Sequence, residues 1–227
     1  MAPSRFMLFH RNEDGTTIME FTIAMMTFFL VLFGVIEFTY AYYQWSAASK
    51  AMQVGARIAA VSNPITPGLR TWTGVGGSII PGDPMPTFDV TCQMNGGALS
   101  CVGSPAAVTA TPSVTAFQDI VYGRGNATSP RSCVNPPASP RNTGMCNIFN
   151  RITHNNVFVR YQYTGLGYAG RPGGTVPTIT VGLRGDNVGR LTYTHIFIGG
   201  LMNFAPVTLP GFSTTVTGED LNLAAPL

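Results

Sequence analysis

The chain has 227 residues, of which 45% are hydrophobic and only 10% charged, whereas about 25% of the residues of an average soluble protein are charged. Its net charge of +3 comes from basic residues that are scattered singly, with Lys50 the only lysine. Because no run of basic side chains could neutralise successive phosphates, the composition argues against nucleic-acid binding. The length allows one large domain, or a small domain with an additional element.

An uncharged run near the N-terminus predicts a membrane-spanning helix. Residues 21–36 carry no charge, and a helix over residues 18–43 is long enough to cross the roughly 30 Å hydrocarbon core of a bilayer. Arg5 and Arg11 precede the run, which favours a cytoplasmic N-terminus. Aromatic residues typical of the headgroup layer follow it: Tyr40, Tyr42, Tyr43 and Trp45. The rest of the chain is therefore expected to face outward.

The helical pattern continues beyond the membrane until Asn63-Pro64 ends it. Small residues recur every four positions and form one smooth face: Ala47, Ala51, Gly55 and Ala59. We therefore predict one stem helix over residues 16–62, similar in shape to a pilin stem. Its smooth face suits packing against the chain's own sheet and packing against neighbouring helices equally well.

A cleaved secretory signal is the alternative reading of this region, with a cut among the small residues 46–48. Glu13 and Asp14 interrupt the basic segment that such a signal needs, so we favour the membrane helix. Glu37 interrupts the apolar run and is predicted to lie at the membrane interface, with no role assigned.

Two motifs on the stem resemble those of a known family. Gly15 is followed five residues later by Glu20, then by Phe21 and a hydrophobic helix. This resembles the prepilin-peptidase site of the tight-adherence (Tad, or Flp) pilus proteins, which are type IV pilin-like. Residues 51–61, AMQVGARIAAV, resemble the helix end of the TadE-like pseudopilins and add Arg57 to the packing residues of the stem.

The resemblance implies that residues 1–15 are a leader cut off after Gly15 on the cytoplasmic side, leaving Thr16 as the new N-terminus. Glu20 is a carboxylate close to the membrane core, which is costly unless it has a partner. The new α-amine of Thr16 would supply that partner from one helical turn away or from a neighbouring subunit.

The resemblance also implies a non-enzymatic minor pseudopilin without cofactor, metal or small-molecule substrate. Its expected partners are a prepilin peptidase, sister pseudopilins, the major pilin, an inner-membrane assembly platform and membrane lipid. The expected location is the bacterial inner membrane, with residues 63–227 in the periplasm or on the extracellular fibre.

Two alternatives remain open. One is a signal-anchored extracytoplasmic enzyme or ligand-binding protein, and the other is an uncleaved bitopic scaffold. A cleft that brings together acidic and histidine side chains would favour the enzyme; the candidates are Asp89, Asp119, His154 and His195. A flat sheet docked on one long helix would favour the pilin-like reading.

The four cysteines all lie in the outward part and form no Cys-x-x-Cys pair, which argues for disulfides over zinc or redox sites. With Gly96-Gly97 as a hairpin turn, Cys92 and Cys101 lie opposite each other on the two strands, and we predict a bridge between them. Cys133 and Cys146 then form the second bridge. The other two connectivities and free thiols remain possible.

The outward part is predicted to be α+β, with an antiparallel sheet packed against the second half of the stem. The expected elements are strands 88–94, 98–102, 157–163, 178–183 and 191–198, and helices 115–122 and 145–154. The tail after residue 199 is expected to be irregular or an edge segment.

Three motifs are discounted. Residues 165–170, GLGYAG, match a dinucleotide pattern but lack the helix that must follow it. Residues 184–186, Arg-Gly-Asp, lie between two strands and are predicted to form a turn. Asn126 begins a glycosylation sequon whose use depends on the host.

Overall fold

The computed structural model describes residues 14–125, 131–137, 139–193, 195–197, 199 and 207–218; Asn126 lies outside them. The chain divides into two compact units. Unit 1 comprises residues 1–43 and 194–206, and unit 2 comprises residues 44–193 and 207–227. The helix α2 (Asp14–Ala60) contributes to both units.

The predicted α+β architecture is confirmed: a long N-terminal helix is combined with one antiparallel sheet and short helices. The five strands have the order β2-β1-β3-β4-β5, and every neighbouring pair is antiparallel. Their bounds are β1 (Asp89–Asn95), β2 (Ala98–Ser104), β3 (Val157–Gln162), β4 (Thr178–Leu183) and β5 (Ser213–Thr217). The short helices are α3 (Gly68–Thr71), α4 (Ala106–Thr109), α5 (Val114–Tyr122), α6 (Met145–Ile148), η1 (Pro140–Asn142) and η2 (His154–Asn156).

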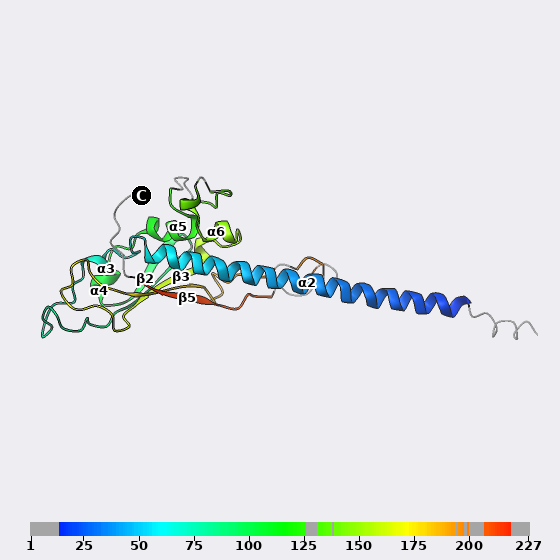
Figure 1. Ribbon diagram of the computed structural model, residues 1–227, viewed down its shortest axis with the longest axis horizontal. Helices are drawn as coiled ribbons and strands as arrows, with labels where there is room; N and C mark the ends of the chain where they lie inside the picture. The colour runs from blue at the N-terminus through cyan, green and yellow to red at the C-terminus, as the bar shows by residue number, and fades with distance from the viewer. Residues whose placement is uncertain are drawn as a thin grey trace, which may run out of the picture. The chain divides into compact units, whose positions relative to one another are not determined.

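The core of unit 2 lies between the sheet and the C-terminal part of α2, residues 44–60. Alternate residues of β3 are buried, because successive side chains of a strand point to opposite faces: Val157, Val159 and Tyr161. Small side chains and one methionine of α2 meet this face: Ala48, Ala51, Met52, Ala56 and Ala59. Figure 1 shows the strands running beside this part of α2, with α5 and α6 also alongside it.

The helix α5 matches its predicted position closely, and local chemistry explains both of its ends. The Ser113 hydroxyl accepts a hydrogen bond from the N–H of Ala116 at 3.2 Å, which is a standard N-cap. Gly123 ends the helix with a positive φ of 85°, a conformation that glycine adopts without steric cost. Phe117, Ile120 and Val121 bury the inner face of α5 in the core.

The predicted helix over residues 145–154 was wrong in its length. Only Met145–Ile148 is helical, and Phe149 is extended, with φ −139° and ψ 99°. Met145, Phe149 and Ile152 are nevertheless buried as the spacing suggested, whereas Ile148 is exposed. The apolar spacing therefore reflects burial of an irregular segment and was mistaken for a continuous helix.

The predicted strand over residues 191–198 was also wrong. Among the described residues of this segment, Thr192 alone forms a bridge, to Thr208, flanked by backbone hydrogen bonds of residues 191 and 193 to residues 209 and 207, and the edge of β4 is occupied by β5. The N–H groups of Ile196 and Phe197 bond to the carboxylate of Glu37 instead of to a strand. The expectation that the tail would supply an edge segment is met by β5, at the end of the sheet order.

Both cysteine pairs are bonded, Cys92 to Cys101 and Cys133 to Cys146. The first pair lies in the β1–β2 hairpin, where the two residues are directly opposite in register. The second pair joins positions 13 residues apart and ties an irregular segment to α6. The first bridge thus crosslinks the β1–β2 hairpin, and the second attaches an irregular segment to the core through the buried Cys146.

Removing the second bridge should lower the stability of unit 2. We expect the double variant Cys133→Ser, Cys146→Ser to lose about 3 kcal/mol of unfolding free energy, because the bridge restricts the unfolded chain. Guanidinium unfolding of the detergent-solubilised full chain, followed by circular dichroism, measures the loss. An unchanged unfolding midpoint would show that the bridge contributes no stability.

Candidate functional site

The start of α2 presents the motif that the sequence singled out. Gly15, Thr16, Glu20 and Phe21 all lie on its first turns, and all are exposed. The position that a Cβ on Gly15 would occupy has no atom within 4 Å. Among the described residues, none forms an ion pair with Glu20. This end of the helix is therefore open to an enzyme or to a neighbouring chain.

The apolar segment that follows has a surface suited to lipid. Large side chains are exposed on every face of it, including Phe21, Met26 and Val35. Three threonine hydroxyls in the segment donate to the carbonyl four residues earlier, which satisfies them without water: Thr22, Thr27 and Thr39. One helix of the described residues, Gly15–Ala60, is long and apolar enough to cross a membrane. It fits a single-pass membrane anchor.

Glu37, the charged residue inside this segment, is enclosed. Its carboxylate accepts hydrogen bonds from the N–H of Ile196 at 3.1 Å and of Phe197 at 3.1 Å. Nδ1 of His195 lies 3.1 Å from Oε1, in position to donate. Only 6% of Glu37 is exposed. The interfacial position predicted from sequence did not anticipate these partners, because 158 residues separate Glu37 from His195.

The smooth face of the stem lies inside the chain's own core. Ala51, Gly55 and Ala59 are buried, and Ala47 is partly buried against the same cluster. A Cβ on Gly55 would come within 2.5 Å of the Met145 sulfur, so α6 packs directly on this glycine. Arg57 is exposed on the opposite side. Of the two kinds of packing that the sequence allowed, the structure displays packing against the chain's own fold.

Three of the four residues that would have favoured an enzyme, Asp89, Asp119 and His154, have separate partners in unit 2, whereas His195 pairs with Glu37 in unit 1. Asp89 pairs with Arg160, whose Nε lies 2.7 Å from Oδ1. This hydrogen bond, with the Arg160 charge, lowers the pKa of Asp89. Asp119 pairs with Arg131. Among the described residues, no group of three His, Cys, Asp or Glu side chains could share a metal ion.

His154 bonds to Tyr122 on α5. The Tyr122 hydroxyl and His154 Nδ1 are 2.7 Å apart, and the His154 N–H lies 3.4 Å from the same hydroxyl. In this geometry a neutral His154 that carries its proton on Nε2 accepts a hydrogen bond from the Tyr122 hydroxyl at Nδ1. Burial lowers the pKa of His154 from its ordinary 6.5. The pair thus fastens η2 to α5 with a neutral imidazole.

The lowered pKa predicts how stability depends on pH. The unfolded chain binds a proton at His154 more readily than the folded one, so stability is full above pH 6.5 and falls as pH drops through the folded pKa. His154→Gln retains an acceptor but cannot titrate, so it should reduce the loss of stability between pH 7.5 and 5.5. Thermal melts of both proteins across this range provide the measurement. Parallel curves would assign the pH dependence to other groups.

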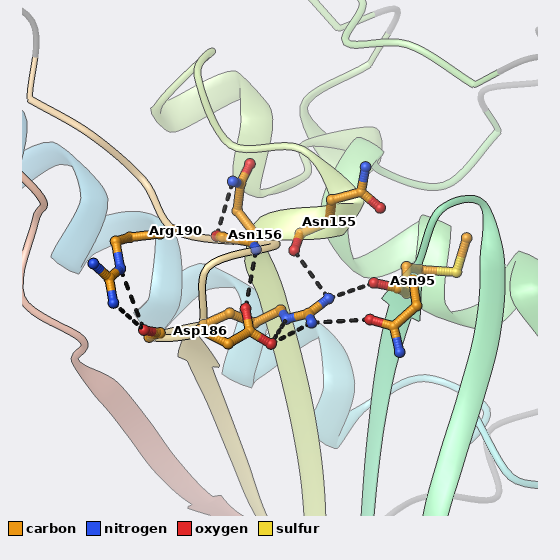
Figure 2. A network of polar contacts seen from close by, with 9 residues as sticks. Asn95, Asn155, Asn156, Asp186 and Arg190 are labelled. Atoms are coloured by element: carbon orange, nitrogen blue, oxygen red, sulfur yellow. Dashed lines mark hydrogen bonds and ion pairs between the residues drawn. The ribbon is translucent and has the colours of Figure 1, made fainter. Parts of the chain in front are cut away.

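The Arg-Gly-Asp tripeptide links β4 to a turn over residues 187–189, which follows the tripeptide instead of lying within it as expected, and its arginine points inward. Arg184 donates to the carbonyls of Met94 and Asn155, to Oδ1 of Asn95 at 2.9 Å, and to the carboxylate of Asp186. Figure 2 shows this network, in which Arg190 also donates to the Gly185 carbonyl and Asn156 to Gly189. The side chain of Arg184 is 3% exposed. It is therefore unavailable to a receptor.

One comparison with known proteins bears directly on the stem. The sequence model of a family described as TadE-like protein matches residues 15–57. The N-terminal stem is therefore similar to that of TadE-like proteins. The matched segment begins at the exposed Gly15 and ends at Arg57, so it covers the first motif, most of the second, and none of the sheet. No curated protein and no solved structure matches the chain.

The match relates the stem to TadE-like proteins of the Tad pilus system. Members of such a family are structural and non-enzymatic in kind. The segment that follows residues 165–170 leads into β4 without a helix, so the dinucleotide pattern lacks the helix that it requires. The matched region is therefore the best candidate for the functional site.

Proposed function

We propose that this chain is a TadE-like minor pseudopilin that takes part in assembling a Tad pilus. It is held in the bacterial inner membrane by the apolar part of α2 and cut after Gly15 by a prepilin peptidase. The observation that carries this proposal is the family match beginning at Gly15, on an exposed helix start that also presents Glu20 and Phe21.

The proposed topology places the N-terminus in the cytoplasm and unit 2 in the periplasm. Two disulfides in unit 2 support this orientation, since such bonds persist in oxidising compartments. In this topology the two edge strands of the sheet, β2 and β5, lie outside the membrane, where they are available to partners. The proposed partners are the peptidase, sister pseudopilins, the major pilin and the inner-membrane platform.

The intact mass and N-terminal sequence of the membrane-extracted protein test the proposal. In cells with their prepilin peptidase the chain should begin at Thr16, and in cells without it residues 1–15 should remain. A chain beginning near Ser49 would show a secreted protein. An uncut chain in both strains would show a bitopic anchor.

The chain offers a matched pair of variants for this test. Neither Gly15 nor Gly34 has an atom within 4 Å of the position of an added Cβ, so valine fits both sites on the same helix. We expect Gly15→Val to abolish processing and Gly34→Val to leave it intact. Equal processing of the two variants would contradict a cut that depends on Gly15.

A further inference from the structure

The contact between Glu37 and residues 195–197, here named the clip, has a consequence for the membrane. The two carboxylate oxygens share three backbone contacts: Ile196 N–H to Oε1 at 3.1 Å and to Oε2 at 3.2 Å, and Phe197 N–H to Oε2 at 3.1 Å. The rings of Phe33 and Phe197 stack with their centroids 5.1 Å apart. The clip therefore covers the Glu37 carboxylate with backbone donors, and its Phe197 ring covers the neighbouring Phe33 of the stem.

Covering Glu37 changes the length of helix that lipid can surround. The uncharged run before Glu37, residues 21–36, spans about 24 Å, less than the roughly 30 Å of a hydrocarbon core. With Glu37 enclosed, residues 21–43 present no exposed charge, and they span about 34 Å. The clip thus converts a segment that is too short into one that crosses the bilayer.

The clip itself has an apolar outer surface. Ile196 is 47% exposed and Phe197 is 42% exposed, and both belong to the same unit as the exposed stem residues Val35, Ile36 and Phe38. The sequence has no charged residue from Leu191 to Gly218. Water is therefore a poor environment for this surface, and it continues the apolar surface of the stem.

We propose that the clip enters the membrane together with the stem, so that this chain contacts lipid through a second, non-helical segment. Non-helical backbone is tolerated at membrane depth only where its polar groups have partners. The Glu37 carboxylate supplies a partner for the N–H groups of Ile196 and Phe197, and the same N–H groups offset the cost of placing a carboxylate there. The carboxylate and the two N–H groups therefore stabilise each other inside the membrane.

This inference rests on the membrane anchorage in the proposed function and not on the pilus role. Its test is the depth of a nitroxide label at Ile196→Cys in the full chain, reconstituted in lipid vesicles. The four native cysteines are bonded in pairs, so one added cysteine can be labelled. Phe38→Cys on the stem and Val188→Cys in unit 2 serve as references, since both residues are well exposed.

Collisions of the label with oxygen, which concentrates in lipid, are compared with collisions with a water-soluble nickel chelate. We expect the label at 196 to favour oxygen as the label at 38 does, and the label at 188 to favour nickel. A label at 196 that behaves like 188 while 38 remains in lipid would overturn this inference alone. Nickel preference at 38 would overturn the membrane anchorage as well.

A variant of Glu37 tests whether this carboxylate holds the clip in the membrane. Glu37→Gln keeps the shape but replaces one acceptor oxygen with an amide donor facing the clip, so the label at 196 should lose its oxygen preference. Thr39→Val is the matched control, because the Thr39 hydroxyl bonds within the helix to Val35. Unchanged oxygen preference at 196 in both variants would show that Glu37 does not hold the clip in the membrane.

Discussion

Replacing Arg184 with Met is expected to lower the free energy of unfolding by about 3 kcal/mol, chiefly because the buried Met94 carbonyl loses its donor. The guanidinium group joins the end of β1 to η2 and to the turn after β4. Methionine fills part of the volume but leaves the carbonyls of Met94 and Asn155 without this donor. Each buried acceptor that loses its partner costs about 1–3 kcal/mol.

The conservative variant separates charge from geometry at this site. Arg184→Lys keeps one positive charge but cannot direct several fixed N–H groups at four acceptors. The free energy of unfolding of this variant should therefore lie between those of Arg184→Met and the unmodified protein. Chemical unfolding of the full chain in detergent gives all three values. Equal stability of the Lys variant and the parent would show that the charge alone matters.

Asp186 gives an independent readout of the same network. The Arg184 hydrogen bond holds the pKa of Asp186 below its ordinary value, and the side chain is 45% exposed. Solvent screens this contact, so its share of the stability is small. Most of the loss in Arg184→Met is therefore assigned to the buried Met94 carbonyl.

The parts of the fold that sequence predicted are those set by local chemistry. The Gly96-Gly97 turn fixed the register of its two strands, which placed Cys92 opposite Cys101. The alternation of residues 157–163 fixed the buried face of β3. In each case the residues that determine the structure lie within a few positions of one another, so one sequence suffices to see them.

The parts that sequence missed depend on distant residues. Nothing near residues 191–198 indicates that β5 occupies the edge of β4, so an apolar segment of strand-like composition was assigned to the sheet. Glu37 likewise carried no local sign of its partner. The long uncharged stretch after Arg190 was the one available signal that this segment could lie beside an apolar helix.

The smooth face of the stem shows a different limit. Small residues at a spacing of four indicate close packing but not its partner. The structure buries Ala51, Gly55 and Ala59 against the chain's own sheet and helices. The residues of the stem that remain available for contacts with sister subunits are therefore its exposed ones, which include Glu20 and Arg57.

Substitution of Glu20 should accordingly disrupt assembly without affecting processing. After the proposed cut, the α-amine of Thr16 lies one helical turn from Glu20 in the same chain or near Glu20 of a neighbour. Glu20→Gln removes the charge that neutralises this amine. An unpaired charge at the bilayer centre costs about 3 kcal/mol, and the cost is smaller for the Thr16 amine at the membrane border, so we expect about a tenfold loss of incorporation.

Two measurements on the same cells distinguish assembly from processing. The N-terminal sequence of the Glu20→Gln chain should still begin at Thr16, whereas its copurification with sister pseudopilins and the number of fibres per cell should fall. Thr22→Val, two residues along the exposed helix, is the control, because the Thr22 hydroxyl bonds only within its own helix, to Ile18. Normal fibre numbers in Glu20→Gln would show that the carboxylate is not needed for assembly, and they would not contradict the proposed cut after Gly15. Loss of processing in that variant would instead assign Glu20 to recognition by the peptidase, since the carboxylate would then be needed before any neighbouring subunit is met.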